Sequence, residues 1–222
     1  MKWPTIDELR ALSPLPQGYQ FDRLERVHVP RLIMNIRDWH PSISVGVNSG
    51  YLREEYYINK VFFEGEDDRD IWVIPITFDG ECVGIWSVER EIDSLALYGR
   101  LIVLAPEHRG VNLTGFIING TACVGQYMGA AFLYTVVTLQ IVQAQRALER
   151  AGFRLLGFFP GYDREEISPG VVKRVYQAVY AKLLVSADEV LYPDPKNMTQ
   201  KAKTLFDLLF ADVSAVNRQD GT

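Results

Sequence analysis

The sequence is poor in the residues that bind metals and form disulfides. Its 222 residues include two cysteines, Cys82 and Cys123, and three histidines, all widely spaced. Two distant cysteines in apolar stretches are typical of reduced core residues, so we expect no metal site and a cytoplasmic protein. The first ten residues, MKWPTIDELR, lack the apolar centre of a signal peptide.

The chain also lacks blocks of positive charge and long unbroken apolar segments. Its formal net charge is −5 and no run of lysine or arginine stands out, which argues against nucleic acid as a partner. The most apolar stretch, residues 115–139, is interrupted by polar residues and glycines. We interpret this stretch as a helix followed by a strand, and we expect no membrane span.

The residues that are abundant suit a large buried core. Hydrophobic residues make up 48% and aromatic residues 12% of the chain. We predict a single domain over residues 1–222, with a core at about 19–186 and a C-terminal helix at about 196–212. The apolar residues of that helix can pack on the core or on a second copy, so a homodimer stays open.

The first third of the chain predicts helices around one strand. Thr5 and Glu8 have the spacing of a capping box at the start of a short helix. The patterns that follow indicate a strand at 19–26, a helix at 29–39, a loop at 41–50 and a helix at 52–63.

Residues 70–185 predict a mixed sheet with two helices. An Asp-Gly turn at 79–80 joins two strands into a hairpin, and a third strand follows at 94–105. The remaining elements are a helix at 111–125, a strand at 131–139, a helix at 140–151, a strand at 153–159, a loop at 165–170 and a strand at 175–185. The order β-β-β-α-β-α-β-β is that of an α+β fold.

The centre of this region joins a strand to the start of a helix. An apolar run ends at Ala105, and Arg109 and Gly110 precede the next apolar segment. A helix start offers unpaired backbone N–H groups and a partial positive charge, which suit a phosphate group. Arg109 can add its own charge, or it can be a surface residue that stabilises an ordinary turn.

This stretch resembles the pyrophosphate loop of the GNAT acyltransferase superfamily, Gln/Arg-x-x-Gly-x-Gly/Ala. Arg109 matches the first position, whereas Asn112 and Thr114 replace the two small residues. Asparagine tolerates a positive φ well, so Asn112 can mimic glycine. The order of elements and the Gly152-Phe153 pair at the end of the second helix also resemble the family.

The resemblance covers roughly residues 19–186 and implies a GNAT-like α+β fold, with a central splayed β-sheet flanked by helices. It also implies that acetyl-CoA, or another acyl-CoA, binds as co-substrate. The residues implied in cofactor binding are Ile102, Val103, Leu104, Arg109, Gly110, Val111, Asn112, Leu113, Thr114 and Gln143.

The activity implied is N-acyl transfer, in which a small-molecule amine or a protein amine attacks the thioester directly. This reaction needs a base for the amine and often an acid for the leaving thiolate. Glu89 and Glu91 are candidate bases. Leu148 occupies the usual position of the family's tyrosine acid, so either proximity suffices or another tyrosine serves. The candidate tyrosines are Tyr134, Tyr176 and Tyr180.

Two alternatives remain at this stage. The changes at Asn112, Thr114 and Leu148 also fit a non-catalytic GNAT-like module that binds CoA or another protein. The third possibility is a different α+β domain in which the turn at Arg109 only packs. Four residues are candidates to line an acceptor pocket, and none of them identifies the acceptor: Trp39, His40, Tyr56 and Tyr57.

Overall fold

The structure, a computed structural model, describes residues 1–211. The chain divides into two compact units, Met1–Leu184 (unit 1) and Val185–Thr222 (unit 2). A single domain over the whole chain stays a prediction.

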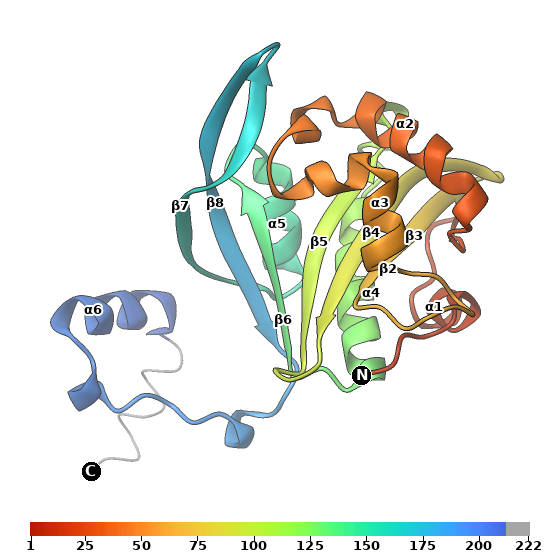
Figure 1. The fold of residues 1–222 in the computed structure, drawn as a ribbon. Helices are drawn as coiled ribbons and strands as arrows, with labels where there is room; N and C mark the ends of the chain where they lie inside the picture. Colours follow the sequence, from red (N-terminus) through yellow and green to blue (C-terminus); the bar gives the residue numbers. More distant parts are fainter. Residues whose placement is uncertain (212–222) are drawn as a thin grey trace. The chain divides into compact units, whose positions relative to one another are not determined.

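Unit 1 is built around an eight-stranded mixed sheet (Figure 1). The strands are β1 (Tyr19–Phe21), β2 (Val61–Phe62), β3 (Ile71–Phe78), β4 (Glu81–Glu91), β5 (Ala96–Leu104), β6 (Phe132–Thr138), β7 (Arg154–Ser168) and β8 (Val171–Leu183). They are arranged in the order β1-β3-β4-β5-β6-β8-β7, with β2 beside β3. The pairs β5–β6 and β2–β3 are parallel, and the other pairs are antiparallel.

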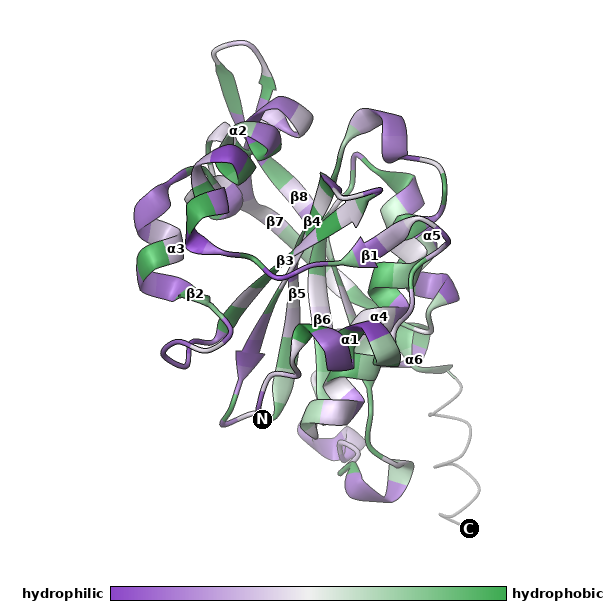
Figure 2. Ribbon diagram, turned by 90° about the vertical axis from the view of Figure 1, so that its right-hand side faces the viewer, coloured by the Kyte–Doolittle hydropathy of each residue, from purple (hydrophilic) through white to green (hydrophobic). Residues whose placement is uncertain are grey.

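Helices cover both faces of this sheet (Figure 2). One face carries α2 (Val29–Trp39) and α3 (Glu54–Lys60), and the other carries α1 (Ile6–Leu12), α4 (Leu113–Met128) and α5 (Val142–Arg150). Each face has its own cluster of buried apolar side chains. Two apolar clusters on one sheet explain why β3 and β4 are apolar almost throughout, since both of their faces are buried.

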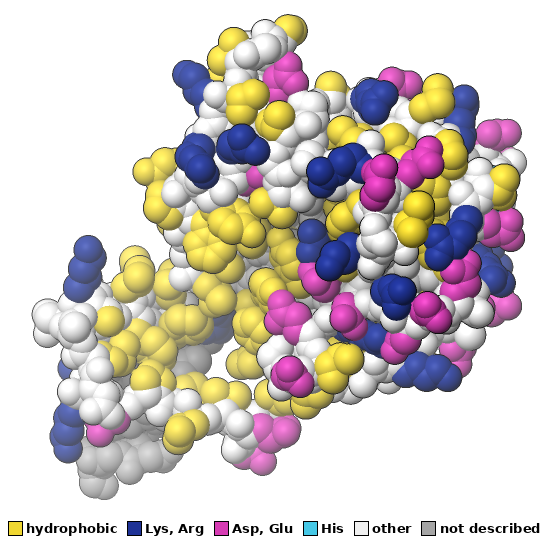
Figure 3. Space-filling model, in the orientation of Figure 1, with side chains coloured by type: hydrophobic (Ala, Val, Ile, Leu, Met, Phe, Trp, Pro, Cys, Tyr) yellow, Lys and Arg dark blue, Asp and Glu magenta, His cyan; other side chains and the backbone are white. Residues whose placement is uncertain are grey.

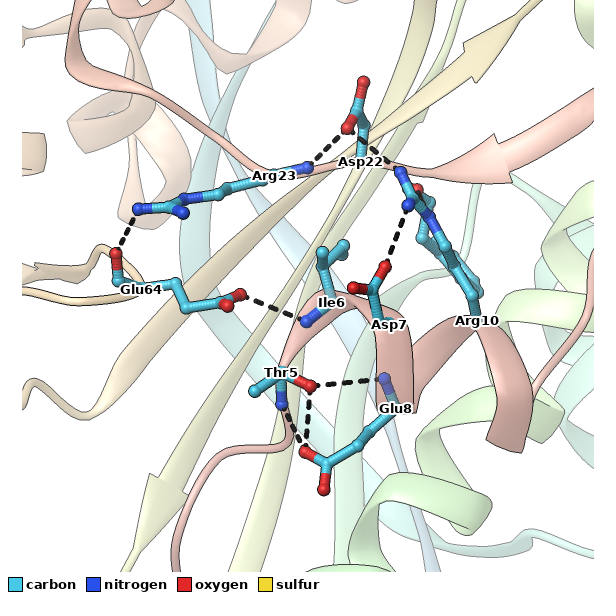
Figure 4. A network of polar contacts seen from close by, with 9 residues as sticks. Thr5, Ile6, Asp7, Glu8, Arg10, Asp22, Arg23 and Glu64 are labelled. Atoms are coloured by element: carbon cyan, nitrogen blue, oxygen red, sulfur yellow. Dashed lines mark hydrogen bonds and ion pairs between the residues drawn. The ribbon is translucent and has the colours of Figure 1, made fainter.

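The capping box predicted at the first helix is confirmed (Figure 4). The Glu8 N–H donates to Thr5 Oγ1 at 3.2 Å, and the Thr5 N–H donates to Glu8 Oε2 at 2.7 Å. Glu64, which lies before β3, accepts a hydrogen bond from the Ile6 N–H at 3.1 Å. These bonds satisfy N–H groups that a helix start leaves unpaired.

The predicted order of elements from residue 70 onward is confirmed. The predicted loop at 165–170 is wrong, because β7 continues to Ser168 and β8 already begins at Val171. The outer half of this hairpin is largely exposed and carries charged residues among its apolar ones, and its register shifts at three places. Bulges and exposed polar residues remove the regular alternation that marks a strand in the sequence.

Several of the boundaries predicted before residue 70 are also wrong. The strand predicted at 19–26 ends at Phe21, and the helix predicted at 52–63 covers only α3. Val61 and Phe62 leave the helix and pair with β3, where Val61 is buried. The region predicted as a loop at 41–50 contains two 3₁₀ helices, Pro41–Ser44 and Val47–Leu52.

Unit 2 contains the predicted C-terminal helix as α6 (Gln200–Leu209). Thr199 caps it by accepting a hydrogen bond from the Ala202 N–H at 3.2 Å. Residue 212, the last of the predicted range, lies outside the described residues. The homodimer stays a prediction. Over residues 1–211, no helix is both long and apolar enough to cross a membrane.

Candidate active site

Strands β5 and β6 lie side by side only where they begin. Their pairing runs from Ala96 opposite Phe132 to Gly99 opposite Thr135. β5 continues to Leu104 and β6 to Thr138 without pairing to each other, so the two strands part in a wedge (Figure 1). The predicted splay of the sheet is therefore confirmed.

A β-bulge lies at the point where the strands part. In the register of β4 with β5, Ser87 faces Leu101 and Val88 faces Gly99, so Arg100 is an extra residue on β5. Such an insertion bends a strand. Thr135 holds β6 at this point, because its hydroxyl donates to the Gly99 carbonyl at 2.7 Å.

The loop that follows β5 leads into α4 with two residues of positive φ. Gly110 has φ 101°, and Asn112, the N-cap of α4, has φ 60° and ψ 19°. Asn112 thus takes the left-handed conformation that the sequence led us to expect. The N–H groups of residues 110–114 have no hydrogen-bond acceptor within the described part of the chain. They lie at the positive end of a 16-residue helix.

The side chain of Arg109 connects two parts of unit 1. Its Nε donates to the Leu104 carbonyl at 3.0 Å, and its Nη2 donates to the Trp39 carbonyl at 2.6 Å. These contacts match the alternative in which Arg109 stabilises its own loop. Two of the donor groups of Arg109 are therefore engaged by the protein's own backbone.

A small cavity lies between α4 and α5, beside this loop. Its lining residues are Asn112, Gly115, Asn119, Ala147, Arg150 and Ala151. A Cβ at Gly115 would lie 2.7 Å from Asn112 Oδ1, so a larger residue there would displace the Asn112 side chain. Gln143, which the sequence analysis placed near the cofactor, lies exposed on α5 and outside this lining.

Three of the five catalytic candidates, Glu89, Glu91 and Tyr134, lie on the face of the sheet that α2 and α3 cover. Glu89 forms an ion pair with Arg100, the bulge residue. The Tyr134 hydroxyl donates to the Glu91 carboxylate, and its ring stacks on Tyr98 with centroids 4.7 Å apart. Burial, followed by the bond to Glu91, raises the pKa of Tyr134 above its usual range.

Tyr180 lies apart from Glu89, Glu91 and Tyr134. Its side chain is 2% exposed on the opposite face, where its hydroxyl donates to Glu149 of α5 at 3.0 Å. Burial and the bond to Glu149 raise the pKa of Tyr180 to about 12. The structure therefore does not bring Tyr180 together with Glu89 and Tyr134.

A group of tyrosines surrounds Arg100, and the sequence analysis identified only part of it. Arg100 Nε donates to the Tyr51 hydroxyl at 3.2 Å, and that hydroxyl lies 2.7 Å from Ser87 Oγ. The Tyr56 hydroxyl is buried and lacks a hydrogen-bond partner among residues 1–211. Tyr57 is a core residue that donates to the Tyr51 carbonyl. The arginine inside the apolar strand sequence LYGRLIVL is the signal that could have located this group.

Residues 39–47, here called the connecting segment, link the loop between β5 and α4 to the β7–β8 hairpin. At one end, Trp39 accepts the hydrogen bond from Arg109. At the other end, the Val47 N–H donates to Asp163 Oδ1 at 2.8 Å, and Ser44 Oγ donates to Glu166 Oε2 at 2.5 Å. The segment therefore connects structures on either side of the wedge between β5 and β6.

His40 in the connecting segment should make stability depend on pH. Burial, and then the charge of Arg109, lower the pKa of His40 below its usual value of 6.5. His40 therefore binds a proton more readily in the unfolded chain than in the folded chain, and the free energy of unfolding should decrease as pH falls below about 6.5. Each unit of pKa depression corresponds to about 1.4 kcal/mol.

Urea unfolding at several pH values between about 7.5 and about 5 measures this effect. The His40→Gln variant should lose part of the decrease, while His28→Gln, at an exposed histidine, serves as the control. Identical pH dependence in His40→Gln and the unmodified protein would contradict the assignment.

Comparison with known proteins identifies the fold. No protein-family model matches the sequence, and no curated protein matches it. Solved structures do match. RimL, a ribosomal L7/L12 α-N-protein acetyltransferase in complex with coenzyme A, is 13% identical, with a TM-score of 0.58 over 77% of this chain and 96% of RimL.

Two further structures show the same likeness. Spermidine N-acetyltransferase from Vibrio cholerae is 15% identical, with a TM-score of 0.58 over 75% of this chain and 94% of that chain. The microcin C7 self-immunity acetyltransferase MccE, in complex with acetyl-CoA and AMP, is 14% identical, with a TM-score of 0.56 over 78% of this chain and 99% of that chain. The chain therefore has the GNAT fold of these N-acetyltransferases, as its sequence predicted.

Proposed function

We propose that this protein is an acyl-CoA-dependent N-acyltransferase that transfers an acetyl or another acyl group to an amine. The observation that carries the proposal is the wedge between β5 and β6, which opens beside the unpaired N–H groups of residues 110–114. Other structures with this fold are acetyltransferases in complex with coenzyme A or acetyl-CoA, which supports an acyl-CoA donor here.

The donor would lie in the wedge, with its pyrophosphate at the start of α4. The N–H groups from Gly110 to Thr114 would bind the phosphate oxygens, helped by the helix dipole. The backbone of Ile102, Val103 and Leu104 would pair with the amides of the pantetheine arm, as an extended peptide pairs with a strand edge. Gln143 on α5 would meet the distal part of the donor.

The acceptor amine would approach from the face covered by α2 and α3. Its nitrogen forms a C–N bond with the acyl carbon while the C–S bond breaks, its proton passes to a base, and the thiolate leaves to become the thiol of CoA. Glu89 is a proposed base, although its pairing with Arg100 makes it a weaker one. Glu91 is the second candidate base, and Tyr134 is the proposed source of a proton.

Two measurements test the function. Acetyl-CoA should stabilise the protein in a thermal shift experiment, by about 2.7 kcal/mol at 100 times its Kd. Thiol release from acetyl-CoA with a panel of amines should then show transfer. Stabilisation without transfer to any amine would favour the alternative, a CoA-binding or protein-interaction module without catalysis. No stabilisation would contradict donor binding altogether.

Substitution of Asn112 tests whether CoA binds at this loop, because the substitutions below change the backbone preference at residue 112. Asn112→Val should weaken CoA binding by about tenfold or more, because a β-branched residue disfavours φ near 60°. Asn112→Gly should retain binding, since glycine adopts this conformation readily. Titration calorimetry with CoA measures both. Equal affinities for the two variants would count against binding at this loop.

A further inference from the structure

Beside α2 and α3, the face of unit 1 is hollowed over β5 and β6 (Figure 3). Hydrophobic side chains gather at the centre of this hollow, and charged side chains of both signs lie along its edge (Figure 3). Arg100 and Glu89 form an ion pair on this face, and their side chains are 14% and 29% exposed. Opposite charges that lie side by side and reach the surface suit a ligand that itself carries both charges.

The Arg100 guanidinium has donor groups that the protein does not use. Its Nε donates to the Tyr51 hydroxyl and its Nη1 donates to Glu89, whereas its Nη2 has no hydrogen-bond acceptor within residues 1–211. A guanidinium carries five N–H groups in a planar fork that matches a carboxylate. The two N–H groups of Nη2 are therefore available to a ligand.

The Tyr56 hydroxyl is a second unused donor near this guanidinium. The Tyr56 ring lies 4.9 Å from the ring of Tyr51, and its buried hydroxyl lacks a hydrogen-bond partner within the described part of the chain. Burial, followed by the neighbouring Tyr51, raises the pKa of Tyr56 above its usual range, whereas the charge of Arg100 lowers it. The hydroxyl therefore keeps its proton. A buried donor without an acceptor costs free energy, which an arriving oxygen atom would recover.

Beside the ion pair, a second carboxylate lacks a basic partner. Glu91 lies two residues from Glu89 on β4, so both side chains point to the same face. Within residues 1–211, Glu91 forms no ion pair and accepts hydrogen bonds from the hydroxyls of Tyr134 and Ser94. The charges of both glutamates act on the Tyr134 hydroxyl. An ammonium group beside Tyr134 would therefore be attracted by two carboxylates.

Three kinds of ligand can be compared at the polar cluster, here defined as Arg100, Tyr56, Glu89 and Glu91. A ligand with only a carboxylate would meet one arginine and two glutamates, so repulsion would offset its pairing. A ligand with only an ammonium group would leave the unused donors of Arg100 and Tyr56 without an acceptor. An α-amino acid supplies both charges. Because its two charged groups are attached to one carbon, they match the direct contact between Glu89 and Arg100.

We propose that the acceptor is an α-amino acid. Its carboxylate accepts hydrogen bonds from Arg100 Nη2 and the Tyr56 hydroxyl, and its amino group lies beside Glu89 and Glu91. This inference rests on the proposed function, because it takes the hollow, at the point where β5 and β6 part, as the acceptor site. Arg100 and Tyr56 then determine specificity, since they distinguish an amino acid from an amine that lacks the carboxylate.

Titration calorimetry with the full chain saturated with CoA tests the proposal. The probes are L-alanine, L-glutamine and L-phenylalanine, each compared with the amine that lacks its carboxylate and the acid that lacks its amino group. For L-phenylalanine these analogues are 2-phenylethylamine and 3-phenylpropanoate. We expect at least one amino acid to bind at least about tenfold more tightly than both of its analogues. If every amino acid binds no more tightly than its amine, the inference is wrong.

The Tyr56→Phe variant removes only the unpartnered hydroxyl. Its stability in urea should stay the same or rise, because no hydrogen bond within residues 1–211 is lost. Its affinity for the amino acid should fall about tenfold, while that for the matching amine stays unchanged. Tyr127→Phe on α4, where the hydroxyl donates to Glu8 Oε1 at 2.7 Å, is the matched control and should change neither affinity. Full amino acid affinity in Tyr56→Phe would overturn the site, since the hydroxyl would then bind at most a water molecule.

Two charge variants should change the preference in opposite directions. Glu89→Gln should tighten the acid and weaken the amine, each about tenfold. Arg100→Gln should remove the preference for the amino acid over its amine, and Tyr56→Phe keeps this test available if Arg100→Gln does not fold. An unchanged order of affinities in both charge variants would contradict the proposal. CoA binding without amino acid binding would overturn this inference alone, whereas absence of CoA binding in the unmodified chain would overturn the proposed function.

Discussion

Replacement of Gly46 by alanine is expected to detach the β7–β8 hairpin from the connecting segment and to destabilise unit 1 by about 2–5 kcal/mol. Gly46 has φ 86° and ψ −164°, a conformation that is essentially restricted to glycine. A Cβ there would lie 2.2 Å from Asp163 Oδ1 and 2.3 Å from the Arg164 carbonyl oxygen. The second of these atoms belongs to the backbone, so a change of rotamer cannot relieve the clash.

Urea unfolding of the Gly46→Ala variant measures the loss, and hydrogen exchange locates it. Exchange should accelerate in residues 41–47 and in the outer half of the hairpin. Gly80→Ala is the matched control, since Gly80 has φ 87° but a Cβ there would meet no atom within 4 Å. An equal loss of stability in both variants would show that the close approach of Gly46 to Asp163 and Arg164 does not contribute to stability.

The Trp86→Ala variant is expected to lose about 3–5 kcal/mol of stability. Trp86 is 1% exposed in the middle of β4, and its ring lies 5.4 Å from that of Phe21. Removal of its side chain would leave a large cavity under α4, whose Gly120 lies beside the Trp86 ring. Little of this space can be filled by neighbours, because β4 is held by strands on both sides.

Chemical unfolding measures this loss, and Trp86→Phe should show a smaller one because it retains an aromatic ring. Trp39→Ala provides a comparison at a partly exposed tryptophan of α2. A loss below about 1 kcal/mol for Trp86→Ala would be incompatible with a buried position in the apolar cluster.

The order of the elements was predictable because each strand and helix carries its own local pattern. Residues 29–39 have helical spacing of apolar residues, and α2 covers the same range. The predicted element boundaries were wrong where pairing with an adjacent strand determines the conformation. Val61 and Phe62 continue an apolar pattern, and only the adjacent β3 selects strand over helix at these residues.

The conformation of the loop before α4 was predictable for the same reason, since Arg109, Gly110 and Asn112 lie close together in sequence. The contacts between the connecting segment and the β7–β8 hairpin were not, because they join distant residues: Val47 and Asp163 are separated by 116 positions. Tyr180 shows a further limit. Ala181 faces Tyr134 across β6 and β8, so the preceding Tyr180 points to the other face.

The two hydrogen bonds of Arg109 have a consequence for how two substrates would bind at the proposed sites. One guanidinium group fixes both the end of β5, beside the proposed donor site, and the end of α2, where the connecting segment begins. Any ordering of the loop by the donor therefore also restricts the start of the connecting segment. If the acceptor favours the same arrangement, each substrate raises the affinity for the other, and thermodynamic reciprocity makes the two factors equal. At the proposed sites the two substrates would be cooperative ligands, and mutations at position 109 should alter their mutual dependence as well as their separate affinities.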